Sequence, residues 1–300
     1  MPCCRTLSVL SLTRNTPGKP GDAGDAGGLY TLRLEDPGWD EWLPGQFVML
    51  RRDNPGADCL WARPFSISDA DGDLRVVFQV AGRETAALAG LREGDSLTCW
   101  GPLGNGFSVM ENSPTLLLAG GIGLAPFVGY IKRHPFPETL RLEFGHRLPL
   151  SCYPFLDCTG LDCAGQDCAG AGADRPASRF AARSHLERCA EDLDRFVELL
   201  EDGIRDTAGR GGLVLACGPM PFLRSVHRFA GRYNARAELS LETRMACGIG
   251  ACLGCVVKGR VRHEAPPGFA KETPPEFGFV QTCTAGPVFR AEDLDLEEGA

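Results

Sequence analysis

The sequence predicts a multidomain chain that joins an all-β part to an α/β part and ends in a small metal-binding domain. Residues 1–108 contain short apolar runs bounded by turn residues, which are typical of antiparallel strands. Residues 109–238 contain continuous apolar runs that lead into glycine-rich turns, as expected of buried parallel strands. Residues 239–300 carry a close group of cysteines. A chain of 300 residues has room for two or three such domains.

The composition is that of an ordinary globular protein, with 43% hydrophobic and 23% charged residues. The formal net charge of −8 argues against a nucleic-acid surface. No apolar run reaches the roughly 18–20 residues that a membrane helix needs, so no membrane segment is expected. The start, MPCCRTLSVLSLTR, lacks the layout of a signal peptide and is expected to be a first strand. The 14 cysteines then predict a reducing cytoplasm, where cysteine more often binds metal or reacts than forms disulfides.

The first part is expected to form a small antiparallel β-barrel. A Gly/Pro/Asp-rich loop separates its first two runs, and a short helix is expected over 85–91. The six runs that predict strands are Arg5–Leu12, Leu29–Leu34, 44–52, 63–70, 74–80 and 95–100.

The run Arg63-Pro64-Phe65-Ser66 in this barrel is a candidate cofactor motif. An arginine at a strand end can hold a pyrophosphate through two hydrogen bonds, and a nearby hydroxyl can bond a ring nitrogen or carbonyl. Pro64 restricts the backbone between them. Taken alone, the motif is a weak signal, and a solvated arginine beside ordinary strand serines is the favoured explanation. The glycine-rich turn GPLGNGF at 101–107 adds little support.

The second part opens with the apolar run Thr115–Ala119, which leads directly into Gly120, Gly121 and Gly123. A strand, a glycine-rich turn and then a helix, here expected over Phe127–Arg133, present backbone N–H groups to a phosphate. The turn is not G-x-G-x-x-G, because Pro126 occupies the position of the last glycine. The alternative is a tight strand-to-helix turn without a ligand.

Further buried strands are expected over Thr139–Phe144 and Gly212–Ala216. The second ends in Cys217-Gly218, at the strand end where α/β folds place their ligands. Cys217 is therefore interpreted as facing a nicotinamide ring, with a small buried hydrophobe as the alternative.

Residues 148–182 interrupt this pattern with a near five-residue repeat that carries Cys158, Cys163 and Cys168. Its spacing fits no metal template, and a low-complexity surface insertion is the favoured interpretation. A helix is expected over 184–204, where His185 and Cys189 lie four residues apart. That spacing can bind a metal ion, although two isolated residues usually do not.

The third part holds the most specific signal, the spacing C-x4-C-x2-C of Cys247, Cys252 and Cys255, followed after 27 residues by Cys283. This is the plant-type ligand pattern of a [2Fe–2S] cluster. Gly248, Gly250 and Gly254 are expected to take left-handed backbone angles and to bring N–H groups close to the sulfurs. Structural zinc usually takes paired C-x2–4-C motifs, so zinc is the less favoured reading and unliganded cysteines the least.

Four motifs occur in a fixed order: RPFS, LLLAGGIGLAPF, ACGPMPFL and ETRMACGIGACLGCVVK. With YTLRLEDPGWDEWLPGQFVML near the start, they resemble the ferredoxin-NADP reductase superfamily and, within it, the electron-transfer subunits of class 1B dihydroorotate dehydrogenase. The resemblance implies three domains: an FAD-binding β-barrel at 1–108, an NAD(H)-binding α/β domain with a parallel sheet at 109–238, and a [2Fe–2S] domain at 239–300.

The resemblance also implies the site residues. Arg63 would meet the FAD pyrophosphate and Ser66 the isoalloxazine, and a second contact stretch would follow on the next strands. Glu84 stands where the family has glycine, whereas Thr85 matches. The full implied set is Arg63, Pro64, Phe65, Ser66, Val77, Phe78, Gln79, Glu84 and Thr85 for FAD, Gly120, Gly121, Gly123, Cys217 and Gly218 for NAD(H), and Cys247, Cys252, Cys255 and Cys283 for the cluster.

The implied activity is electron transfer between the FMN of a partner dehydrogenase and NAD+, through the cluster and FAD. The partner would be the dihydroorotate dehydrogenase catalytic subunit, in a heterotetramer that serves pyrimidine biosynthesis. No catalytic acid, base or nucleophile is required. The insertion at 148–182 replaces a family segment, which leaves NAD versus NADP open. The alternatives are a subunit of another NAD(P)H-dependent flavin/iron–sulfur complex, a redox sensor without nicotinamide turnover, and a zinc-binding module.

Overall fold

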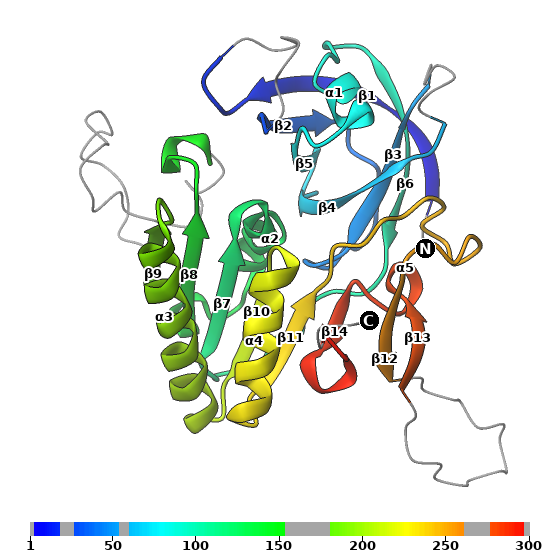
Figure 1. Cartoon of the computed structure of the whole chain (residues 1–300). Helices are drawn as coiled ribbons and strands as arrows, with labels where there is room; N and C mark the ends of the chain where they lie inside the picture. Colours follow the sequence, from blue (N-terminus) through cyan, green and yellow to red (C-terminus); the bar gives the residue numbers. More distant parts are fainter. Residues whose placement is uncertain (1–2, 19–26, 54–59, 154–180, 261–276, 297–300) are drawn as a thin grey trace, which may run out of the picture.

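The N-terminal part folds into a closed barrel of six antiparallel strands (Figure 1). The computed structural model describes residues 3–18, 27–53, 60–153, 181–260 and 277–296. The barrel has the strand order β1-β2-β5-β4-β3-β6, and the short helix α1 (Arg83–Leu88) lies between β5 and β6 in the chain. Its strands are β1 (Cys3–Arg14), β2 (Leu29–Leu34), β3 (Phe47–Arg52), β4 (Arg63–Asp69), β5 (Leu74–Gln79) and β6 (Ser96–Leu103). The predicted antiparallel barrel is confirmed.

The middle part is a six-stranded sheet with the order β14-β11-β10-β7-β8-β9. Its strands β7 to β11 are parallel, and β14 is an antiparallel edge strand. The bounds are β7 (Thr115–Gly120), β8 (Leu140–His146), β9 (Ala181–Leu186), β10 (Leu213–Cys217), β11 (Arg236–Ser240) and β14 (Val288–Arg290). Every residue of β7 is buried, as its continuous apolar run predicts. The predicted parallel α/β sheet is confirmed.

Helices cover both faces of this sheet. The helix α2 (Ala125–Arg133) follows a short 3-10 turn at Gly121–Leu124 and packs on the face that carries Leu117 and Ala119. The helices α3 (Ala190–Gly209) and α4 (Met220–Arg232) pack on the opposite face (Figure 1). Alternate side chains of β7 therefore enter two separate cores, because successive strand residues point to opposite faces.

The last part of the chain is a hairpin of β12 (Val256–Arg260) and β13 (Phe277–Gln281), followed by the one-turn helix α5 (Thr282–Ala285). The chain then runs through Gly286-Pro287 into β14, which pairs with β11. The C-terminal part thus reaches across and completes the edge of the α/β sheet. Of the Cys-rich repeat, Cys158, Cys163 and Cys168 lie outside the described residues.

The predicted helix over 184–204 is wrong at its start. Residues up to Leu186 belong to strand β9, and α3 begins only at Ala190 and continues to Gly209. His185 and Cys189 therefore do not share a helix face. The apolar spacing is real, since Phe196 and Leu200 are buried, but Leu186 is exposed on the edge strand. Pairing of β9 with β8 overrides the local helical pattern.

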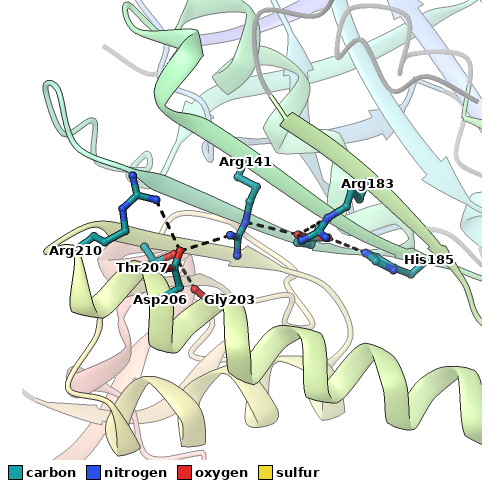
Figure 2. A network of polar contacts seen from close by, with 8 residues as sticks. Arg141, Arg183, His185, Gly203, Asp206, Thr207 and Arg210 are labelled. Carbon is teal, nitrogen blue, oxygen red and sulfur yellow. Dashed lines mark hydrogen bonds and ion pairs between the residues drawn. The ribbon is translucent and has the colours of Figure 1, made fainter. Parts of the chain in front are cut away.

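A buried carboxylate joins this edge strand to the rest of the sheet. Glu143 on β8 accepts hydrogen bonds from Nε2 of His185 at 2.7 Å and from the guanidinium of Arg183, whose Nε lies 3.0 Å away. Arg141 lies between Glu143 and α3, where its Nη1 is 3.7 Å from Asp206 (Figure 2). The network connects β8, β9 and α3 on one side of the sheet.

The barrel and the α/β part meet along helix α2. Gly129 of α2 lies against Trp42 and 3.0 Å from the Ser68 carbonyl oxygen, measured from where a Cβ would stand. The Arg133 guanidinium donates to the Trp42 carbonyl oxygen at 2.6 Å, and Lys132 pairs with Asp69 at 2.9 Å. Among the described residues, no helix combines the length and apolar composition needed to cross a membrane.

Candidate functional site

The four candidate cluster cysteines come together from two segments. Cys247, Cys252 and Cys255 lie in the loop between β11 and β12, and Cys283 lies in α5. The hairpin positions them, because the Thr282 N–H donates to the Cys255 carbonyl oxygen at 2.9 Å. Cys255 and Cys283 are buried, whereas Cys252 is exposed.

The thiols form two pairs. The side chain of Cys247 interacts with that of Cys252, and the side chain of Cys283 with that of Cys255. The two pairs are close enough for the charges of Cys247 and Cys283 to influence each other. Within the part of the chain that the structure describes, no three His, Cys, Asp or Glu side chains surround a single point where one ion could sit. Two thiol pairs suit the two irons of a [2Fe–2S] cluster held by four cysteines.

Backbone amides favour a thiolate at the first cysteine. Desolvation opposes the charge, but N–H donors from Ile249, Cys252 and Ala251 and the side chain of Cys252 lower the pKa of Cys247 to about 7. The Ile249 N–H lies 3.4 Å from the Cys247 sulfur. At Cys283, desolvation and the neighbouring Cys255 raise the pKa of the metal-free thiol to about 12. Backbone N–H donors at Cys247, and from Gly250 at Cys283, suit an anionic iron–sulfur group.

The loop reaches this shape through left-handed backbone angles. Gly248 has φ +72° and Gly250 has φ +84°, as predicted. The prediction for Gly254 is wrong, because the neighbouring Leu253 takes the left-handed angle instead, at φ +57°. The Gln281 side-chain amide donates a hydrogen bond to the Gly250 carbonyl oxygen at 2.7 Å, which connects the loop to β13.

The barrel forms the floor of this site. Buried Met49 and Phe47 on β3 and Leu103 on β6 pack with Met245, Cys255 and Cys283 in one apolar group. A cavity of about 510 Å³ lies beside it and is lined by Cys3, Cys4, Arg51, Leu60, Trp61, Ala62, Trp100, Leu103, Ala246, Cys247 and Ile249. The structure thus places the candidate cluster directly against strands β3 and β6.

The candidate flavin motif lies on β4, next to β3. Arg63 and Phe65 alternate with Pro64 and Ser66 along the strand. Phe65 points into the barrel core, where its ring meets Phe78 edge-on with centroids 5.8 Å apart. Pro64 and Ser66 are partly exposed and stand opposite Met49 and Phe47 of β3. The exposed face of the motif therefore borders the floor of the candidate cluster site.

The remaining predicted flavin residues divide into accessible and buried ones. Val77 and Phe78 are buried on β5, so only their backbone groups can reach a ligand, whereas Gln79 is exposed. Thr85 caps α1, where its hydroxyl accepts bonds from the N–H groups of Ala81 and Gly82 at 2.9 and 3.1 Å. Glu84 is buried and lies 3.3 Å from Nε of Arg52.

The predicted nicotinamide residues meet at the carboxyl ends of β7 and β10. Between these neighbouring strands the strand order reverses, which is where α/β sheets bind ligands. The turns pack glycine on glycine: a Cβ on Gly218 would lie 3.1 Å from Gly120, and one on Gly123 would collide with the Cys217 carbonyl. Gly121 adopts φ +54°.

Cys217 ends β10 at this edge. Desolvation raises the pKa of its thiol to about 12, so the group is neutral at physiological pH. The next residue, Gly218, lines a cavity of about 230 Å³ together with Pro219, Met220, Leu223, Glu242, Thr243 and Arg244.

Known proteins are similar to this chain in sequence. The family model described as the iron-sulfur cluster binding domain of dihydroorotate dehydrogenase B matches residues 242–295. A relative from Caldanaerobacter subterraneus subsp. tengcongensis, named dihydroorotate dehydrogenase B (NAD(+)), electron transfer subunit, is 30% identical over 84% of this chain and 86% of its own length. A relative of the same name from Geobacillus kaustophilus is 31% identical over 84% of this chain and 87% of its own length. The chain belongs to the family of dihydroorotate dehydrogenase B electron transfer subunits. The predicted resemblance is confirmed.

Solved structures show how widely the fold of this electron transfer subunit family is shared. The NADH-dependent reduced ferredoxin-NADP oxidoreductase aligns with a TM-score of 0.66 at 20% identity, over 97% of this chain and 90% of that chain. A ferredoxin-NADP+ reductase from Plasmodium falciparum aligns with a TM-score of 0.55 at 12% identity, over 78% of this chain and 95% of that chain.

Two barrel residues that were not among the predicted site residues hold the candidate cluster site. The indole N–H of Trp100 donates to the Cys247 carbonyl oxygen at 3.1 Å, and the side chain of Asn105 bonds both backbone groups of Val288. Trp100 ends the run predicted as the strand 95–100, and Asn105 lies in the glycine-rich turn GPLGNGF at 101–107. Their contact partners lie more than 140 residues away, where no local pattern points to them.

Proposed function

We propose that this chain carries electrons between a partner dehydrogenase and NAD+, as the electron-transfer subunit of a dihydroorotate-oxidising enzyme. One observation carries the proposal. In a member of the dihydroorotate dehydrogenase B family, the paired cysteines rest on β3, directly beside the candidate flavin strand β4. A metal-cluster site beside a flavin site is the arrangement that this electron transfer needs.

The residues of the chain hold and tune the cofactors. Cys247, Cys252, Cys255 and Cys283 would ligate a [2Fe–2S] cluster, and backbone amides around Cys247 would stabilise its negative charge. Arg63 would bind the FAD pyrophosphate, with Ser66 at the isoalloxazine and Thr85 ordering the neighbouring turn. When bound, flavin exchanges electrons in pairs with nicotinamide and singly with an iron–sulfur centre, which is why both groups are needed.

Nicotinamide would bind at the reversal of strand order between β7 and β10. Gly121 would let a phosphate approach the backbone, Gly120 and Gly123 would keep the turn packed against Cys217 and Gly218, and Cys217 and Gly218 would border the ring. The names of the relatives specify NAD(+), which supports NAD rather than NADP for this chain.

The relatives are named as subunits, which supports a partner that oxidises dihydroorotate at an FMN in pyrimidine biosynthesis. Oxidation of dihydroorotate to orotate releases two electrons and two protons, and NAD+ takes two electrons and one proton. Exposed Ile249 (63%) and Leu253 (65%) beside the cysteines are suited to contact that subunit in a heterotetramer. Met245 is buried and packs beneath the site.

Three domains follow from this assignment: an FAD barrel at 1–108, an NAD domain at 109–238 and a cluster domain at 239–300. The family match at 242–295 supports the last. A reducing cytoplasm is the proposed location. The ten described cysteines are all free thiols, which supports it.

The test is the absorbance spectrum of anaerobically purified chain, with iron, sulfide and flavin assays, before and after NADH is added. We expect flavin, iron and sulfide together, with bleaching by NADH. Cofactors that NADH does not reduce would argue against the nicotinamide site. A colourless protein with zinc and no iron would refute the proposal.

A further inference from the structure

Strand β6 and the turn after it contact both segments that form the candidate cluster site, the loop between β11 and β12 and the segment from α5 to β14. β6 ends at Leu103, and the turn continues through Gly104 and Asn105. Leu103 packs in the apolar group that contains Cys255 and Cys283. A flavin-domain segment thus contacts a site that the sequence assigns to a separate domain.

The first contact is made by Trp100. Its indole N–H donates to the Cys247 carbonyl oxygen at 3.1 Å. A peptide unit is planar and its C=O and N–H point in opposite directions. Holding this carbonyl therefore sets the direction of the Gly248 N–H, at the first residue of the loop that takes a left-handed angle.

The second contact is made by Asn105, on the far side of the site. Its Nδ2 donates to the Val288 carbonyl oxygen at 2.7 Å, and its Oδ1 accepts the Val288 N–H at 3.0 Å. Its own N–H donates to the Gly286 carbonyl oxygen at 2.8 Å. Gly286 in turn donates to the Thr282 carbonyl oxygen at 3.1 Å, which closes the turn of α5 that carries Cys283.

Gly104 allows these contacts. Its backbone has φ +70°, and a Cβ there would collide with the Gly286 carbonyl oxygen. The backbones at Gly104 and Gly286 are therefore in direct contact. The side-chain amide of Asn105 makes the hydrogen bonds to Val288 that the backbone of a neighbouring strand would otherwise make.

We infer that Trp100 and Asn105 are positioning residues for the iron–sulfur cluster, through which the flavin barrel sets the geometry of ligands Cys247 and Cys283. The inference rests on the proposed function. Outer-shell partners of metal ligands orient those ligands, and hydrogen bonding and burial around the sulfurs tune the potential of the cluster. The arrangement makes the properties of the cluster depend on the barrel as well as on its own loop.

The test replaces Trp100 by Phe in the full chain, which removes the N–H and keeps a ring in place. Trp61→Phe is the matched control, because Trp61 lines the same cavity, is exposed, and its indole nitrogen has no hydrogen bond to another described residue. The readouts are the EPR g-values of the reduced cluster, its midpoint potential in a dye-mediated titration, and the rate at which a chelator removes iron.

We expect Trp100→Phe to change the g-values and the midpoint potential and to speed iron loss by about 10-fold. This is the lower end of the range of effects for residues that hydrogen-bond to metal ligands. Trp61→Phe should match the wild type. Equal effects of both variants would overturn the inference, because ring packing alone would then explain them. So would a Trp100→Phe variant that matches the wild type in all three readouts.

Asn105→Ala gives a second test, which decides the question if Trp100→Phe does not fold. It should keep its flavin and lose iron faster, whereas unchanged iron loss and g-values would overturn the inference for Asn105. The iron and sulfide content of the wild-type protein distinguishes failure of this inference from failure of the proposed function. Wild-type protein without iron and sulfide refutes the proposed function itself, whereas loaded wild type with unaffected variants refutes only the positioning role.

Discussion

At the scale of single residues, strand β4 divides the RPFS motif between two environments. Phe65 enters the barrel core, and Pro64 and Ser66 face outward beside β3. The Arg63 side chain is held near the strand start, where its Nη1 donates to the carbonyl oxygens of Trp61 and Ala62, each at 3.1 Å. Nη1 of the guanidinium is thus held by the backbone, which leaves its other N–H groups to bind an anion.

We expect Arg63→Gln to weaken FAD binding by about 10- to 100-fold, because charge-assisted bonds to a pyrophosphate contribute about 1.5–3 kcal/mol. Flavin fluorescence in a titration of apoprotein measures this. The control is Arg33→Gln, which removes an exposed arginine of the same barrel that pairs with Asp73 at 2.7 Å. An Arg63→Gln variant with wild-type affinity would contradict the assigned role.

Cys283 supplies the one candidate ligand that comes from outside the tight loop. We expect Cys283→Ser to reduce bound iron from about two atoms per chain to nearly none, because a [2Fe–2S] cluster needs four protein ligands. Iron and acid-labile sulfide assays measure the loss.

Cys189→Ser is the control for this change, since Cys189 is an exposed thiol at the start of α3 and serine is a good helix N-cap. Its iron content should equal that of the wild type. Full iron and sulfide content together with a wild-type visible spectrum in Cys283→Ser would remove Cys283 from the ligand set, because a serine oxygen bound in its place would change the spectrum.

At the scale of elements, the edge strand β9 depends on a charged contact inside the sheet. Desolvation raises the pKa of Glu143, but hydrogen bonds from His185 and Arg183 outweigh it and lower the pKa below its ordinary value. A carboxyl whose pKa is lower in the folded state stabilises the fold at pH above its unfolded value of about 4.3. That contribution disappears as the pH falls through the lower folded pKa.

Glu143→Gln should therefore lower the free energy of unfolding by about 2 kcal/mol at neutral pH, because the cations around it lose their partner. The difference from wild type should shrink as the pH falls below about 4. Urea unfolding followed by far-UV circular dichroism at several pH values measures both effects.

Glu198→Gln, an exposed change on α3, should match the wild type at every pH. A Glu143→Gln difference that stays constant down to the acid limit of the fold would show that shape, and not charge, makes position 143 important.

At the scale of the whole molecule, α2 holds the barrel against the α/β sheet. The helix approaches so closely at Gly129 that Trp42 lies on its backbone, and Arg133 covers the Trp42 ring at 4.9 Å. This contact places the flavin strand β4 and the turn after β7 next to each other, because α2 directly follows that turn and contacts β4. The relative position of the two candidate nucleotide sites thus depends on this contact, in which Gly129 allows the close approach.

Gly129→Ala should destabilise the protein by about 1–3 kcal/mol, because the added methyl group collides with Trp42 and approaches the Ser68 carbonyl. In an isolated helix the same change would stabilise by about 1 kcal/mol. Differential scanning calorimetry measures the sign. Gly231→Ala in α4, where no described residue outside the helix's own backbone lies within 4 Å of the added methyl, should raise the stability instead. A stabilised Gly129→Ala protein would mean that the barrel contact is loose.

The sequence alone determined the features that depend on near neighbours in the chain. The spacing of Cys247, Cys252 and Cys255 defines the ligand loop, and the glycines at 248 and 250 permit its left-handed turns. The buried runs of β7 and β10 and the glycines that follow them predict a ligand site at the strand ends. Each pattern is local, so backbone geometry and side-chain periodicity suffice to read it.

Only the tertiary structure decided which distant surfaces meet. The residues after Cys283 run into the edge strand β14 of the α/β sheet, Trp100 and Asn105 of the barrel hold both sides of the candidate cluster site, and His185 lies in a strand because β9 pairs with β8. These contacts join segments up to 183 residues apart. They form because the whole chain buries its apolar faces and satisfies its backbone groups together, which local propensity does not encode.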